Sequence, residues 1–186
     1  MSTIKRICIC AICIALCYVL PLALHPIGMG QILSPMHLPV LLCGLICGWY
    51  YGAICGIIGP ILASMLSGKP PVSMLMSMIP ELCIYGIVCG ILMKLIRSRH
   101  TYIDLYAAMI PAMILGRIVG GLAKYILYVA GKSDSGITIA TWVSSYIVGT
   151  FPGIIVQLLL IPTLVFVLMK AHLIPDRYPK DRLQKA

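Results

Sequence analysis

Long apolar stretches, separated by short polar or charged segments, make up most of the chain. Several of them reach the roughly 20 residues that a helix needs to cross a hydrocarbon core. The stretches are divided by a polar loop at 25–36, by the turn signal SGKPP at 67–71 and by GKSDSG at 131–136. The pattern predicts helices at about 4–24, 37–48, 51–66, 73–95, 102–131 and 138–171.

The segment 38–68 contains no charge, and its division into helices is ambiguous. A single helix of this length would measure about 46 Å, well beyond the roughly 30 Å hydrocarbon core. At its middle lies GWYYG, residues 48–52, which combines two glycines with aromatic residues typical of a membrane interface. We therefore expect two short helices here.

The distribution of Lys and Arg favours six helices. With six, both termini lie on one side, and ten basic residues lie there against Lys69 and Lys132 on the other. Those ten are Lys5, Arg6, Lys94, Arg97, Arg99, Lys170, Arg177, Lys180, Arg182 and Lys185. Five helices would lose most of this asymmetry, and the basic side is normally cytoplasmic. We predict an all-α integral protein of the cell membrane, a single six-transmembrane-helix domain over 1–186 with both termini cytoplasmic.

Composition agrees with a membrane protein. Hydrophobic residues make up 61% of the chain and charged residues 10%, against about 25% charged in soluble domains. The first apolar run follows Lys5 and Arg6, as in a signal peptide, but no small-residue cleavage site leads into a soluble domain, so we expect a retained helix. The net charge of +9 lies mostly at helix ends, which topology explains without nucleic acid.

No catalytic signature occurs in the sequence. G-x-S-x-G, H-E-x-x-H and a Walker A lysine are all absent, so we expect neither an enzyme nor a cofactor. The nine Cys are odd in number and lie in apolar runs, which favours packing over disulfides or metal binding. His25 and His37 lie twelve apart without carboxylates, so we expect no metal there either.

Three ionisable residues, Glu81, Arg117 and Lys124, lie well inside predicted helices, away from the helix ends. A charge at the bilayer centre costs at least about 2.5–3.5 kcal/mol, so such residues face the bundle interior and have a partner or a role. One interpretation is a structural ion pair of Glu81 with Lys124 or Arg117. One acid against two bases still leaves a positive charge, which would suit an anionic or zwitterionic ligand. Helical spacing adds neighbours, and the candidate ligand-binding residues of these helices are Met78, Glu81, Tyr85, Arg117, Lys124, Tyr128, Trp142, Ser145 and Tyr146.

Two motifs resemble the substrate-binding S components of energy-coupling-factor (ECF) vitamin transporters. The first is SPMHLPVLLCGLICGWYYG at 34–52, in which a polar loop leads into His-x-Pro and a glycine-spaced short helix ends in an aromatic–glycine turn. The second is AICIA at 11–15, which places Ala11 and Ala15 four apart on the first helix. The six predicted helices and the outward loop after the first helix agree with this resemblance.

The resemblance implies the substrate-specific subunit of an ATP-driven importer. Such a subunit captures a vitamin or related small molecule from outside and topples in the lipid bilayer on a shared transmembrane coupling subunit, while two ATPase subunits drive release. It implies that Ala11 and Ala15 face the coupling subunit. It also implies that segment 25–36 closes over the ligand, with Gln31, Ser34 and His37 as contacts.

The sequence is compatible with two classes of ligand. The surplus positive charge favours a carboxylate-bearing or zwitterionic molecule, pantothenate-like or niacin-like. A neutral heterocycle, such as a pyridoxine-like molecule or a cobalamin precursor, fits if Glu81 and Lys124 neutralise each other. The alternative function is a stand-alone secondary transporter or channel for a small solute, although no repeat relates residues 1–93 to 94–186.

Overall fold

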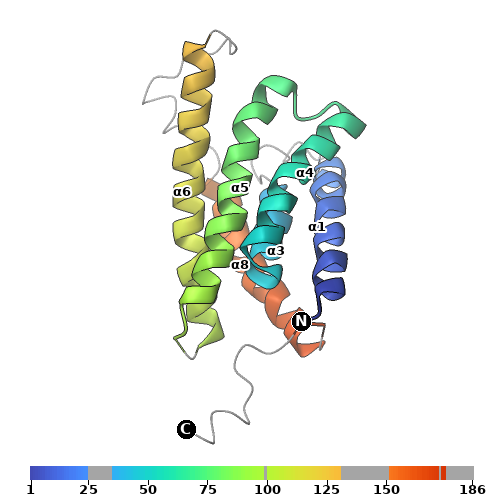
Figure 1. Ribbon diagram of the computed structural model, residues 1–186, viewed down its shortest axis with the longest axis vertical. Helices are drawn as coiled ribbons and strands as arrows, with labels where there is room; N and C mark the ends of the chain where they lie inside the picture. The colour runs from blue at the N-terminus through green and yellow to red at the C-terminus, as the bar shows by residue number, and fades with distance from the viewer. Residues whose placement is uncertain (25–34, 99, 131–150, 172, 175–186) are drawn as a thin grey trace, which may run out of the picture.

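The computed structural model describes residues 1–24, 35–98, 100–130, 151–171 and 173–174, and this part of the chain is helical without strands (Figure 1). Its helices are α1 (Thr3–Leu24), α3 (His37–Cys47), α4 (Trp49–Ser67), α5 (Val72–Leu95), α6 (Thr101–Val129) and α8 (Phe151–Lys170). All but α3 are long and apolar enough to cross a membrane. The predicted all-α membrane class is therefore confirmed.

The described helices alternate in direction between two ends of the bundle (Figure 1). The short connection between α4 and α5 lies at one end. The connection between α5 and α6 lies at the other end, together with the N-terminus of the chain and the last turn of α8. Lys94 and Lys170, in the last turns of α5 and α8, therefore lie at the same end as Lys5 and Arg6.

Gly48 divides the uncharged segment into α3 and α4. Its φ of 101° lies in the region that glycine enters without the strain a side chain brings. Its N–H donates to the Gly44 carbonyl at 3.1 Å and so ends α3. Trp49 and Tyr50 follow and are exposed, as expected of aromatic residues at an interface. The break thus lies within the GWYYG sequence that predicts a turn.

Glycines bring α3, α4 and α5 into close backbone contact. A Cβ placed on Gly44 or on Gly52 would lie 2.7 Å from the Gly86 carbonyl oxygen, closer than real Cβ atoms come. Gly90, one turn further along α5, lies against the backbone of Trp49. Such close approach increases van der Waals contact where lipid removes the hydrophobic drive between helices.

Helix α1 has an inner face of cysteines and an outer face of alanines. Cys10, Cys13 and Cys17 are buried, whereas Ala11 and Ala15 are exposed. All nine thiols of the chain are free, and seven are buried. The cysteines therefore serve as small packing side chains in the described bundle, and the alanine pair faces away from it.

Candidate functional site

Glu81 lies on the buried face of α5, with 4% of its surface exposed. Ser77, Tyr85 and Cys89 follow the same spacing of four residues and are also buried, so they form one stripe along the helix. Pro80 precedes Glu81 inside the helix and has no backbone N–H to donate there. The stripe directs the carboxylate into the bundle and away from lipid.

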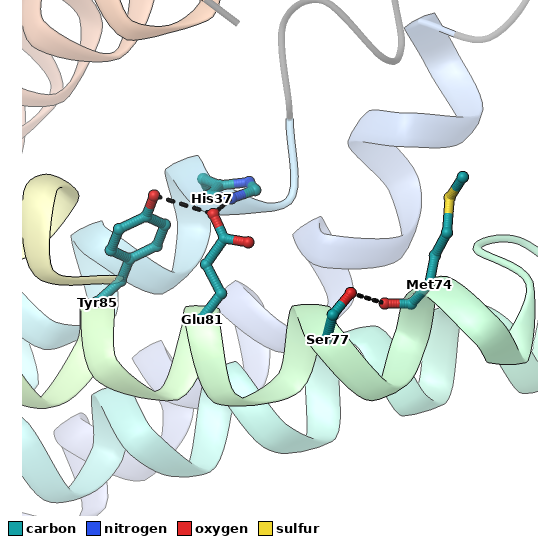
Figure 2. A network of polar contacts seen from close by, with 5 residues as sticks. All are labelled: His37, Met74, Ser77, Glu81 and Tyr85. Carbon is teal, nitrogen blue, oxygen red and sulfur yellow. Dashed lines mark hydrogen bonds and ion pairs between the residues drawn. The ribbon is translucent and has the colours of Figure 1, made fainter. Parts of the chain in front are cut away.

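The Glu81 carboxylate has two close polar neighbours (Figure 2). Its Oε1 lies 3.3 Å from His37 Nε2, and the Tyr85 hydroxyl donates to the same oxygen at 3.1 Å. The His37 and Tyr85 rings lie 5.1 Å apart between centroids, tilted by 58°. An ionised carboxylate only accepts hydrogen bonds, so Nε2 carries the proton in that state. We call His37, Glu81 and Tyr85 the polar cluster.

The short helix α3 explains how an imidazole reaches this depth. His37 is the first residue of α3, which has only 11 residues and is therefore about 16 Å long. The helix begins part-way through the bundle, and its contact with α5 at Gly44 and Gly86 brings His37 to Glu81. The sequence offers Lys124 or Arg117 as an ion-pair partner for Glu81. The structure adds two polar neighbours of its carboxylate, His37 and Tyr85.

Two glycines of α6 form the wall behind the polar cluster. A Cβ on Gly120 would lie 2.6 Å from Glu81 Oε2, and a Cβ on Gly116 would overlap the Tyr85 ring. Gly116 and Gly120, four residues apart on α6, therefore face side chains of α5 and not only its backbone. This arrangement leaves room for the acidic and phenolic side chains of α5 to lie flat against α6.

The other described candidates differ in exposure. Arg117 is buried on α6, between the two glycines of the wall, and Lys124 is half-buried two turns further along. Each of these two side chains takes part in a hydrogen bond, an ion pair, a ring contact or another electrostatic interaction. Met78 is half-buried and packs against the core. Tyr128 is 42% exposed, near the end of α6 that extends beyond α5 in Figure 1.

The remaining predicted contacts lie outside the described residues. They are Gln31, Ser34, Trp142, Ser145 and Tyr146.

Sequence reasoning did not single out Gln157, a buried polar residue on α8. Its side chain is 1% exposed, and neither atom of its carboxamide has a hydrogen-bond partner within the described structure. It lies on the buried stripe of α8, with Gly153 and Ile161 four residues to either side. A signal was present, because Gln157 is the only amide in the apolar run 151–169.

The chemistry of the site suits binding. A carboxylate, an imidazole and a phenol from α3 and α5 meet in the polar cluster, and a guanidinium on α6 and an amide on α8 are also buried. Pockets for small molecules combine apolar and aromatic walls with a few such polar groups. Among the described residues, no group of three or more His, Cys, Asp or Glu side chains is arranged to hold a metal ion.

Comparison with known proteins gives one match. The family model described as "ECF transporter, substrate-specific component" matches residues 5–171, which is nearly the whole chain. No curated protein and no solved structure matches.

Proposed function

Because the chain belongs to the family of substrate-specific components of ECF transporters, we propose that it captures a vitamin or related small molecule from outside the cell for an ATP-driven importer. The observation that carries the proposal is the polar cluster at membrane depth. Its three residues are buried, and they face the bundle interior. Ionisable groups kept inside a membrane protein at such a cost commonly mark a substrate path.

The ligand would lie near the polar cluster, toward the outer half of the bundle. The described contacts engage Glu81 Oε1, and the wall of α6 restricts the space around Oε2. Arg117 and Lys124 would add positive charge from α6. A carboxylate-bearing or zwitterionic molecule uses that charge, whereas a neutral heterocycle needs only the ring faces and hydrogen bonds. Gln31, Ser34, Trp142, Ser145 and Tyr146 are proposed as further contacts from their sequence positions.

The distribution of basic residues supports an orientation in the membrane. We place both termini in the cytoplasm and count six spans, with α3 and α4 as the two short ones. The described ends support this, because Lys5, Lys94 and Lys170 lie at one end of the bundle. Segment 25–36 then lies outside, where it would close over the bound molecule.

The outer face of α1 would dock on the coupling subunit. Ala11 and Ala15 are exposed, and small residues four apart allow two helices to approach closely. Two ATPase subunits would supply the energy. The substrate-binding chain would topple in the membrane while docked, and this movement would bring the ligand to the cytoplasmic side.

Native mass spectrometry of the purified chain tests the binding role. We expect a small molecule to be retained after gentle extraction and lost after denaturation. Reconstitution in liposomes tests the coupling: uptake should require the coupling subunit, the ATPases and ATP. Uptake by this chain alone, without ATP, would contradict the proposal and support a stand-alone transporter or channel.

A further inference from the structure

Gln157 presents an unsatisfied carboxamide in the interior of the bundle. The side chain is 1% exposed, and neither Nε2 nor Oε1 has a hydrogen-bond partner within the described structure. Buried polar groups are nearly always hydrogen-bonded, so such an exception calls for a partner that the described residues do not supply.

The helix of Gln157 shares a neighbour with the polar cluster. Helices α5 and α8 run toward the same end of the bundle, where Lys94 and Lys170 lie (Figure 1). Glu81 and Gln157 each lie about 20 Å along their own helix from these lysines. Helix α3, which carries His37, contacts both α5 and α8. The amide and the polar cluster therefore lie on helices that α3 connects.

We infer that Gln157 contacts the transported molecule and selects one with an amide-like edge. This inference rests on the proposed function and names the substrate class. A carboxamide has a donor and an acceptor side by side. A partner satisfies both atoms only if it presents an acceptor next to a donor, as a primary amide, a lactam, a cyclic urea or a pyrimidinone does.

Other ligand groups satisfy Gln157 only in part. A carboxylate accepts from Nε2 but leaves Oε1 facing a second acceptor. An ammonium group donates to Oε1 but leaves Nε2 without an acceptor. A site with a buried polar group strongly rejects analogues that leave this group unpaired. Gln157 thus favours a neutral amide-like edge over a charged group at this position.

The test compares the wild-type chain with Gln157→Met, which has a similar volume and no hydrogen-bonding amide. Native mass spectrometry measures the retained molecule, and thermal unfolding in detergent measures the stability of the emptied chain. We expect the retained molecule to contain an amide-like group by its fragmentation. We also expect Gln157→Met to lower its occupancy at least tenfold while the emptied chain unfolds at the same or a higher temperature. Thr163→Val, an exposed change on the same helix, is the control and should alter neither quantity.

Two results would overturn the inference while leaving the proposed function intact. In the first, the wild-type chain retains a molecule without any amide-like edge. In the second, Gln157→Met retains the molecule as well as wild type and the emptied variant unfolds at a lower temperature, which would identify Gln157 as a structural group bridged by water. If the wild-type chain retains no molecule and no vitamin in a panel raises its unfolding temperature, the proposed function itself fails and the inference fails with it.

Discussion

Glu81 shows how a single buried charge is stabilised in this bundle. Two donors converge on one carboxylate oxygen, and the second oxygen lies against Gly120. Hydrogen bonds to a charged group contribute about 1.5–3 kcal/mol each, which is comparable to the cost of placing the charge at membrane depth. The cluster can therefore exist without a ligand.

Replacing Tyr85 with Phe removes one donor and keeps the ring against Gly116. We expect Tyr85→Phe to lower the free energy of unfolding by about 1.5–3 kcal/mol, because the Glu81 carboxylate loses a charge-assisted hydrogen bond. Thermal unfolding of the purified chain measures the effect. Tyr125→Phe removes the same group from an exposed position of α6 and should leave the unfolding temperature unchanged. Equal stability of both variants would show that the Tyr85 hydroxyl contributes nothing to the cluster.

Lys124 tests whether positive charge reaches the ligand. If its ammonium contacts the bound molecule, Lys124→Met should weaken binding about tenfold or more, since a hydrogen bond between charged groups is lost. Titration of the identified ligand against the variant measures the affinity. Unchanged affinity together with a lower unfolding temperature would assign Lys124 a purely structural role.

At the scale of helices, glycine has two different uses in the same bundle. Gly44, Gly52 and Gly86 join the backbones of α3, α4 and α5, whereas Gly116 and Gly120 make room for side chains of α5 on the surface of α6. Both uses have the same four-residue spacing in the sequence. Only the neighbours in space distinguish a packing glycine from one that shapes the site.

The variants Gly120→Ala and Gly86→Ala separate these two uses. A methyl group at 120 would meet the Glu81 side chain, so we expect Gly120→Ala to displace the carboxylate and reduce ligand binding at least tenfold. A methyl group at 86 would meet the Gly52 backbone, so Gly86→Ala should destabilise the fold by about 1–3 kcal/mol. Binding assays and thermal unfolding are measured on both chains. Equal ligand binding by wild type and Gly120→Ala would contradict the proposed position of the site.

At the scale of the whole molecule, the proposed function separates an inner binding surface from an outer docking surface. The cysteine face of α1 packs inward, and Ala11 and Ala15 face outward. A docking surface of small residues can change without disturbing the polar cluster, because the two lie on opposite sides of α1. Under the proposed function, the transport cycle would need both surfaces, whereas ligand binding would need only the inner one.

Replacing both Ala11 and Ala15 with Leu tests this separation. The larger side chains would prevent close helix contact, so we expect transport by the complete importer to be lost while ligand binding and the unfolding temperature remain at wild-type values. Uptake into liposomes and ligand titration measure the two activities. Val19→Leu enlarges an exposed residue of α1 outside the motif and should leave both unchanged. Loss of ligand binding in the double variant would mean that this face of α1 does not point toward the partner.

The sequence by itself determined the all-helical membrane class and the family. Long uncharged runs cannot satisfy their backbone groups in lipid except as helices, and the aromatic–glycine turn at 48–52 indicates a break that the backbone of Gly48 makes. The sequence also indicates that the Glu81 side chain faces the bundle interior, because exposing a carboxylate to lipid costs free energy. These features depend on composition and local spacing, and both are given by the sequence alone.

Only the tertiary structure decided which groups meet. His37 and Glu81 are 44 residues apart in sequence. Their contact depends on where α3 begins within the bundle and on where its glycines pack against α5. Charge counting indicates a lysine or arginine partner for Glu81, because opposite charges attract at any separation in sequence. Helix packing decides which other donors come close, and it brings a histidine and a tyrosine to the carboxylate. The same packing buries Gln157 without a hydrogen-bond partner among the described residues, a condition that is defined only in three dimensions.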